Sequence, residues 1–194
     1  LYLPKLNPAN NMQIIQIVKR FGIVGGMEEY VFRLSIELAK LNYRVIILCE
    51  KNYSTPVTGV EVFELGVHSK PSWFAHYKFS GKVKKWLSGN LSPNMIVHSH
   101  ERQSCHHIST FHTTPFNPGK HLFLRLLSLR NLFYEKLEQR EIFSPSVQVI
   151  VPVSNSLGDF IKTKHPNSIE RIMPAIHPGA NLLTNSPIKR SVPM

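Results

Sequence analysis

Two adjacent glycines, Gly25 and Gly26, have the residue type and position that point most directly to chemistry. They follow an apolar segment at residues 14–18, and apolar side chains then recur every three or four positions, so we expect a strand, a tight loop and a helix. A ligand can approach a glycine backbone closely, and the first amides of a helix attract anions. The arrangement indicates a site for a phosphorylated ligand. An ordinary strand-to-helix turn without a ligand is the alternative.

Polar side chains cluster where two later strands are expected to end. His98, His100, Glu101 and Arg102 belong to the first of these places, and His112 follows the next strand. Ligand crevices open at the carboxyl ends of strands in α/β sheets, and an imidazole can hydrogen-bond a hydroxyl through either nitrogen. His112 is therefore a candidate ligand-binding residue, with a loop histidine satisfied by the protein as the alternative. We interpret His98 as structural.

Three charged residues in these segments each allow two interpretations. Glu28 lies in the first turn of the helix that follows the glycines. It either contacts a ligand hydroxyl or only interacts favourably with the helix dipole. Glu101 and Arg102 either order each other or hold hydroxyls and phosphates of a ligand.

A zinc site is the obvious hypothesis for so many histidines close together. Structural zinc sites use paired cysteines or a Cys-Cys/His-His pattern, and a helical His-Glu-x-x-His is a common catalytic pattern. The spacing here fits neither, so we expect no metal. The residues concerned are His98, His100, Cys105, His106, His107 and His112.

Strands and helices are expected to alternate along the chain, which favours a parallel sheet covered by helices on both faces. The expected strands are residues 14–18, 44–49, 60–63, 95–98, 108–111, 147–153 and 169–173. The expected helices follow the glycines to Leu41, and cover residues 71–88, 120–143 and a segment capped by Ser154 or Asn155 that ends near Lys164. The fold class is therefore α/β, with a Rossmann-like sheet.

Composition limits the possible environments. The 194 residues carry a formal net charge of +11 and are 42% hydrophobic, which is ordinary for one globular domain. No apolar run is long enough to cross a bilayer, the first residues lack the pattern of a signal peptide, and two cysteines make no disulfide framework. We therefore expect a cytoplasmic protein whose partners include anions.

The order of these segments resembles the amino-terminal half of a family 4 glycosyltransferase of the GT-B architecture. The resemblance covers about residues 12–181 and is carried by several short segments in the family's order. They are Gly-Gly-Met-Glu at 25–28, Ile-Val-His-Ser-His-Glu-Arg at 96–102, Phe-His-Thr at 111–113, Val-Ile-Val-Pro-Val-Ser at 149–154 and the crossover at 172–181. The segment at 137–143 is most similar to the branch that adds glucose to heptose in the lipopolysaccharide core.

This resemblance implies a function and a set of roles. Such enzymes retain the anomeric configuration, need no metal or other cofactor, and take a nucleotide-sugar, here expected to be a UDP-sugar, as co-substrate. His112 is implied to contact the transferred sugar as the catalytic-site residue. The implied donor-phosphate or acceptor-binding residues are Gly25, Gly26, Glu28, His100, Glu101 and Arg102. The implied acceptor is the lipopolysaccharide core or a similar glycan, and no nucleic acid partner is expected.

The sequence also departs from the family. Ala180 and Asn181 stand where the family usually has valine and aspartate. We expect an irregular leader at 1–11, a Rossmann-like domain at 12–181 and a short tail at 182–194 that leads toward a donor-binding lobe outside this sequence. Because that lobe holds most of the nucleotide-sugar in the family, we expect the 194 residues alone not to transfer sugar.

Three alternatives remain open at this point. A basic, non-catalytic Rossmann-like module that binds a polyanion fits the charge. A dinucleotide-binding oxidoreductase lobe is disfavoured because the loop at 22–26 lacks the Gly-x-Gly-x-x-Gly spacing. The third is a silent remnant of an enzyme gene. A separate question is a peripheral location on the inner face of the cytoplasmic membrane, since a basic face with an aromatic edge can lie on anionic lipid, and a solvated helix face whose apolar side is core is the other interpretation. That face would comprise Lys78, Lys82, Lys84, Lys85, Trp73, Phe74, Tyr77 and Trp86, together with Lys120, Arg125 and Arg130 beside Leu122, Phe123 and Leu124.

Overall fold

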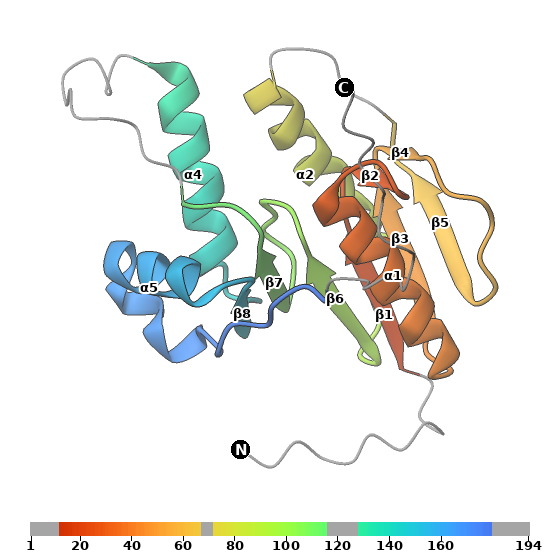
Figure 1. The fold of residues 1–194 in the computed structure, drawn as a ribbon. Helices are drawn as coiled ribbons and strands as arrows, with labels where there is room; N and C mark the ends of the chain where they lie inside the picture. The colour runs from red at the N-terminus through yellow and green to blue at the C-terminus, as the bar shows by residue number, and fades with distance from the viewer. Residues whose placement is uncertain (1–11, 67–71, 116–127, 180–194) are drawn as a thin grey trace, which may run out of the picture.

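A computed structural model of the chain describes residues 12–66, 72–115 and 128–179. Its centre is a six-stranded sheet in which every strand runs parallel to its neighbours, in the order β5-β3-β1-β6-β7-β8 (Figure 1). The strands are β1 Gln13–Ile17, β3 Arg44–Cys49, β5 Val60–Glu64, β6 Met95–Ser99, β7 Ile108–Phe111 and β8 Val149–Pro152. The helices are α1 Gly26–Lys40, α2 Ser72–Asn90, α4 Leu129–Phe143 and α5 Asn155–Lys164, followed by the 3-10 helix η1 Pro166–Arg171.

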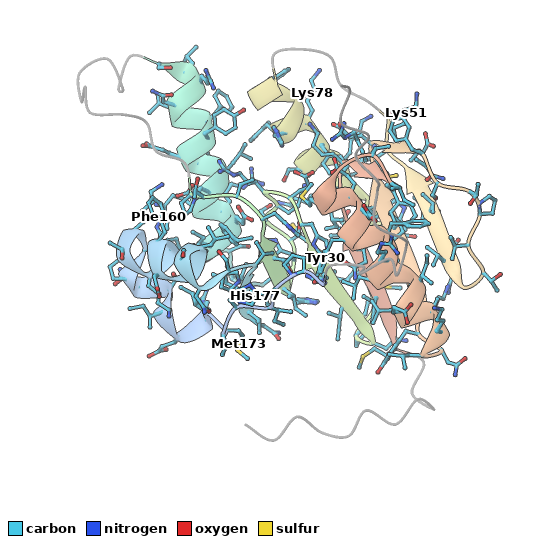
Figure 2. The ribbon with its side chains drawn as sticks, in the orientation of Figure 1. Tyr30, Lys51, Lys78, Phe160, Met173 and His177 are labelled. Carbon is cyan, nitrogen blue, oxygen red and sulfur yellow. The ribbon has the colours of Figure 1, made fainter. Side chains whose placement is uncertain are left out.

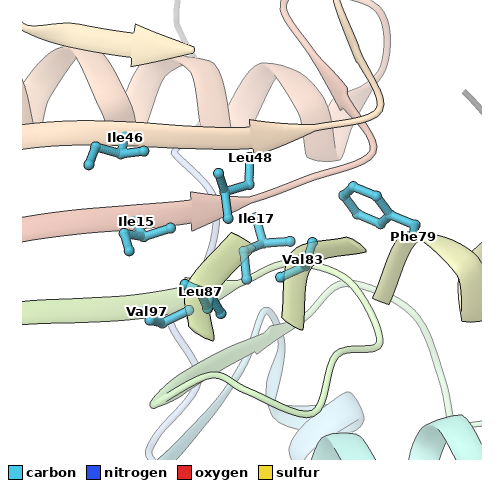
Figure 3. Packing of buried hydrophobic residues seen from close by; sticks show 8 residues of the cluster. All are labelled: Ile15, Ile17, Ile46, Leu48, Phe79, Val83, Leu87 and Val97. Carbon is cyan, nitrogen blue, oxygen red and sulfur yellow. The ribbon is translucent and has the colours of Figure 1, made fainter. Parts of the chain in front are cut away.

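Both faces of the central strands are buried, which explains the apolar run at residues 45–49 of β3. On one face, Ile15, Ile17, Ile46 and Leu48 pack against Phe79 and Val83 of α2 (Figure 3). On the other face, Val45 and Ile47 of β3 pack against Val31 of α1. Side chains of a strand alternate between its two faces, so one strand supplies both cores.

Helices α4 and α5 cover the β8 edge of the sheet, where Phe111, Ile142, Ile150 and Ile161 form a third core (Figure 1). The expected cap of α5 is confirmed at Ser154, whose hydroxyl accepts a hydrogen bond from the amide of Leu157. Each of the three clusters thus packs helices against one part of the sheet. The predicted fold class, a Rossmann-like α/β lobe, is confirmed.

One predicted strand was wrong. Residues 169–171 belong to the 3-10 helix η1, which starts at Pro166. Proline is favoured in a first helical turn because its missing amide needs no partner there. The chain becomes extended only afterwards, where Ile172 forms an isolated parallel bridge with Ile150 and the amide of Met173 bonds the Ile150 carbonyl. Pro174 has no amide hydrogen with which to continue this ladder.

Two other differences concern the start of one helix and a small sheet that was not predicted. Helix α4 begins at Leu129, and the predicted helical residues 120–127 lie outside the described residues, as do the leader at 1–11 and the tail at 182–194. A second, two-stranded parallel sheet pairs β2 Arg20–Phe21 with β4 Lys51–Asn52, and it was not predicted. Two-residue strands are too short to produce a periodic pattern.

From β1 the chain adds strands toward one edge of the sheet, and from β6 it adds strands toward the opposite edge. Strands β1 and β6 lie side by side, although α1, β3, β5 and α2 separate them in the sequence. Connections from these two strands leave toward opposite sides of the sheet, which opens a crevice at their carboxyl ends. The loops that carry the predicted site residues start at this point.

Candidate functional site

The loops after β1 and β6 are joined at their bases by hydrogen bonds. The amide of His100 donates to the carbonyl of Ile17 at 3.0 Å, and the amide of Lys19 donates to Oε1 of Glu101 at 3.2 Å. Residues more than 80 positions apart in sequence therefore share one rigid corner at the topological switch point.

A chain of hydrogen bonds connects the sheet interior to His112. Nε2 of His100 lies 2.7 Å from Oε1 of the buried Gln16, and Nδ1 of His100 lies 3.1 Å from Nε2 of His112. Tyr30 of α1 contacts both rings edge-on and lies between α1 and the end of β6 in Figure 2. These contacts hold His112 in a fixed orientation.

The protonation of this chain follows from its geometry. Burial lowers the pKa of His112 to about 4 and the pKa of His100 well below its ordinary value, so both rings are neutral near pH 7. Because Oε1 of Gln16 only accepts, His100 must donate from Nε2 and accept at Nδ1. His112 then donates from Nε2, which leaves its Nδ1 as a hydrogen-bond acceptor. A hydroxyl is a suitable partner for that atom.

His98 has a different role in the structure. Its Nε2 lies 2.7 Å from the hydroxyl of Thr110 on β7, and its ring packs 4.2 Å from the ring of His100. Burial lowers the pKa of His98 to about 3. The bond to Thr110 joins β6 to β7, and the ring contact helps to hold the ring of His100 in place.

The side chain of Glu28, in the first turn of α1, occupies the space beside Gly25. Glu28 is buried, and its Oε1 accepts a hydrogen bond from Nε of Arg20 at 2.8 Å. A Cβ on Gly25 would collide with Oε2 of Glu28, whereas a Cβ on Gly26 would meet nothing within 4 Å. The space beside Gly25 is therefore taken by Glu28, and Gly26, which is exposed, is the open position at the start of α1.

Glu101 and Arg102 each have other protein partners. Besides accepting a hydrogen bond from the Lys19 amide, Glu101 places its Oε2 3.9 Å from Nδ1 of His76. Burial raises the pKa of Glu101 to about 7. Nη2 of Arg102 lies 3.9 Å from Oε2 of Glu138, and Nε of Arg102 lies 4.0 Å from Oε2 of Glu141. The guanidinium thus joins the loop after β6 to α4.

A cavity of about 290 Å³ lies where these groups meet. It brings together four of the predicted site residues, His100, Glu101, Arg102 and His112. Gly25, Gly26 and Glu28 do not line it, but Met27 does, so the glycine loop borders the cavity at its edge. The full lining is Met27, His76, His100, Glu101, Arg102, Thr110, Phe111, His112, Thr113, Tyr134 and Glu141.

A family model and solved structures show what the chain is similar to. The model of Glycosyltransferase Family 4 matches residues 24–180. The chain belongs to glycosyltransferase family 4. Among curated protein sequences, none matches the chain significantly.

Solved glycosyltransferases share the fold. The crystal structure of WaaG, a glycosyltransferase involved in lipopolysaccharide biosynthesis, matches 82% of the chain with a TM-score of 0.72 at 12% identity. A glycosyltransferase from Rickettsia africae ESF-5 matches 89% of the chain with a TM-score of 0.52 at 18% identity. In both comparisons the family 4 chain spans 44% of the solved protein's length, as expected for one lobe of a GT-B enzyme.

Other findings bear on the sequence hypotheses for this family 4 lobe. Within residues 12–66, 72–115 and 128–179, no three histidine, cysteine or acidic side chains are grouped so that they could hold a metal ion. No helix among the described residues is long and apolar enough to cross a membrane. Cys49 and Cys105 are both free thiols.

Several residues of the site were missed by the sequence reasoning. Gln16, Tyr30, His76, Tyr134 and Glu141 contact the histidines or line the cavity, yet they lie on four different elements. Glu138 and Glu141 repeat at a spacing of three on α4, on its buried side. Two acids on the buried side of an amphipathic helix are a signal that could have nominated Glu141.

Proposed function

We propose that this chain forms the acceptor-side half of a retaining, metal-independent glycosyltransferase that moves a sugar from a nucleotide-sugar, such as a UDP-sugar, to a lipopolysaccharide core or similar glycan. The observation that carries the proposal is the hydrogen-bonded chain from Gln16 through His100 to His112. It ends with a free acceptor nitrogen beside a polar cavity at the switch point of the sheet. Family membership makes sugar transfer the reaction that this arrangement would serve.

In this proposal His112 accepts a hydrogen bond from a hydroxyl of the transferred sugar through Nδ1. The first amides of α1, at Gly26 and the residues after it, face the departing diphosphate, where a partial positive charge stabilises the negative charge that develops. Glu28 and Arg20 hold the loop in shape beside them. Catalysis then depends on positioning and electrostatics, which needs no covalent intermediate on the protein.

The nucleotide-sugar would be held mainly by a second lobe, as the family resemblance implies. The chain spans 44% of the solved glycosyltransferases, so the proposed activity is that of a two-lobe protein. We therefore propose that the 194-residue polypeptide alone does not transfer sugar.

The decisive experiment compares two preparations in a transfer assay with radiolabelled UDP-glucose and deacylated lipopolysaccharide core. A protein in which a family 4 donor lobe follows this chain should label the acceptor, and the 194-residue polypeptide should not. The labelled product should keep the anomeric configuration of the donor, and the reaction should persist in a metal chelator. Turnover by the polypeptide alone, or an inverted product, would contradict the proposal.

The proposed partners include an anionic membrane surface next to α2. Lys78, Lys84 and Lys85 are exposed on this helix, beside the exposed rings of Phe74 and Tyr77. The aromatic edge is smaller than the sequence suggested, because Trp86 packs against Phe63 in the core. Flotation with vesicles that contain phosphatidylglycerol tests the surface: binding should weaken with salt and with Lys78→Glu. Equal binding to neutral vesicles would count against it, and preferential binding to DNA would favour the polyanion module.

A further inference from the structure

Two residues of the cavity lining carry buried polar atoms that the described part of the protein leaves without hydrogen-bond partners. Oε2 of Glu141 and Nη1 of Arg102 are both buried, and neither has a hydrogen-bond partner among the described residues. The other carboxyl oxygen of Glu141 accepts a hydrogen bond from the hydroxyl of Ser109 at 3.0 Å, which fixes the side chain. The Glu141 side chain is only 5% exposed. Buried polar atoms are nearly always hydrogen-bonded, so a pair of them beside a cavity points to a ligand.

The charges around the cavity decide which ligands it can accept. Of the described residues that line it, Arg102 is the only lysine or arginine. Arg102 already lies 3.9 Å from a carboxyl oxygen of Glu138, and the carboxyl group of Glu141 lies 4.0 Å away. Lys164 and His165 lie beyond Glu138, which contacts both of them and separates them from the lining.

The three histidines of the lining add no positive charge near pH 7. Burial lowers the pKa of His76 and the pKa of His112 to about 4, and the pKa of His100 lies well below its ordinary value. Burial raises the pKa of Glu141 to about 8, so near neutral pH this carboxyl carries a proton and can both donate and accept. Among these lining residues, the charge of Arg102 is balanced when one of Glu101 and Glu141 is ionised, and it is outweighed when both are. Glu138, which lies outside the lining, stands 3.9 Å from the guanidinium in every case. A phosphate would meet no unopposed cation here.

We propose that this cavity is a subsite for one neutral sugar ring of the acceptor glycan, and that Glu141 is its specificity-determining residue. A ring hydroxyl would satisfy Oε2 of Glu141, and a ring or hydroxyl oxygen would accept from Nη1 of Arg102. The space of about 290 Å³ is at the small end of ligand pockets, which suits a single ring and is small for a nucleotide. This inference rests on the proposed function, because it takes the ligand to be a glycan.

The subsite selects against phosphorylated sugars although the whole chain is strongly basic. The formal net charge of +11 is carried by residues elsewhere, among them Lys78, Lys84 and Lys85 on the exposed side of α2. The strongly basic surface thus contrasts with a cavity in which the one cation of the described lining faces carboxyl groups. A basic surface can attract an anionic acceptor while the cavity receives one of its uncharged rings.

The test is a binding measurement on the full chain by saturation-transfer NMR, with methyl glucoside and glucose 6-phosphate as a matched pair of probes. The wild-type chain should bind methyl glucoside and should bind glucose 6-phosphate at least about tenfold more weakly. Glu141→Gln should keep binding, because the amide still donates and accepts. Glu141→Leu should weaken methyl glucoside binding by about tenfold or more, since it removes the hydrogen bond.

Controls separate a lost contact from a lost fold. Replacing a buried carboxyl by an apolar residue of similar volume often leaves stability unchanged, and a thermal melt checks this for Glu141→Leu. Glu37→Leu changes an exposed acid on α1 and should bind like the wild type. If Glu141→Leu fails to fold, the discrimination between the two probes by the wild type still tests the inference.

Three results would overturn the inference: no binding of methyl glucoside, equal or tighter binding of glucose 6-phosphate, or unchanged binding by folded Glu141→Leu. The two proposals fail separately. Sugar transfer by the two-lobe protein with an acceptor KM unaffected by Glu141→Leu would refute the subsite alone. Selective binding of the neutral sugar without any transfer activity would refute the transferase proposal and leave the subsite standing.

Discussion

Nδ1 of His100 lies 3.1 Å from Nε2 of His112, and this contact fixes which nitrogen of His112 is left to accept a hydrogen bond. His100 is held in turn by Gln16, so the orientation of a loop residue is set from inside the sheet. A side chain that is already oriented loses little entropy on binding, which makes each of its hydrogen bonds more effective.

The first prediction concerns His112. Changing His112 to alanine should lower kcat/KM for sugar transfer by about tenfold or more, because a hydrogen bond to the transferred sugar is lost. His112→Asn should retain more activity, since its side-chain oxygen can still accept. The assay is initial-rate transfer by the two-lobe protein, with His177→Ala as the control at an exposed histidine. Equal activity of the alanine and asparagine variants would show that the acceptor nitrogen is not used.

The second prediction separates the two glycines. Gly25→Ala should lower stability, because its Cβ would displace the carboxylate of Glu28 and disturb the ion pair with Arg20. Gly26→Ala should leave stability unchanged or raise it by about 0.5–1 kcal/mol, since alanine is the better helix former and the site is open.

Activity and stability should therefore diverge at Gly26. If a diphosphate approaches this backbone, Gly26→Ala should fold normally and transfer sugar poorly. Urea unfolding and transfer rates on the same preparations provide the comparison. A fully active Gly26→Ala protein would mean that the ligand does not come close to that position.

The strands of the sheet could be predicted well, because the apolar run that identifies a buried strand lies within a few consecutive residues. Strand β3 was expected at residues 44–49 and has these bounds, since a run of buried apolar residues identifies a parallel strand on its own. The expectation for residues 169–173 failed for a local reason too, because Pro166 and Pro174 restrict the backbone more strongly than apolar content does.

The site was harder to predict because its contacts are not local. His100 meets Gln16 across 84 positions, and Ser109 meets Glu141 across 32. The type of residue at each strand end was enough to nominate His100 and His112. Only the packing of α4 against the sheet shows that Glu141 lines the same cavity.

The third prediction concerns stability and pH, because the buried histidines and the buried carboxyls have opposite effects. Burial lowers the pKa of His98 to about 3 and that of His112 to about 4, from 6.5. The unfolded chain therefore takes up protons first, and stability is lost as the pH falls from 6.5 toward 4. Burial raises the pKa of Glu101 to about 7 and that of Glu141 to about 8, from 4.5. The native chain keeps those protons longer, so stability is lost as the pH rises from 4.5 to 8.

Among the described residues, the pKa is lowered for six histidines and raised for three carboxyls. Stability should therefore rise between about pH 4.5 and pH 6.5, and the melting temperature should be highest near pH 6.5. Glu141→Gln should reduce the fall above that pH, because it removes the group with the highest shifted carboxyl pKa. Glu61→Gln, at an exposed acid, should not. Thermal unfolding followed by circular dichroism across this range is the measurement. A wild-type melting temperature that still rises from pH 6.5 to pH 8 would contradict the assignment of buried, protonated carboxyls.

The last prediction concerns Glu101, which accepts a hydrogen bond from the Lys19 amide and so ties the loop after β6 to the loop after β1. Glu101→Ala should lower the free energy of unfolding by about 1–3 kcal/mol, because a largely buried amide loses its acceptor. Glu101→Gln keeps an acceptor oxygen and should stay close to the wild type. Glu64 offers a matched control: its carboxylate also accepts from a backbone amide, that of Asn52, but on the surface. Since water can replace that acceptor, Glu64→Ala should cost much less in urea unfolding, and equal losses for the two alanine variants would rule out burial as the cause.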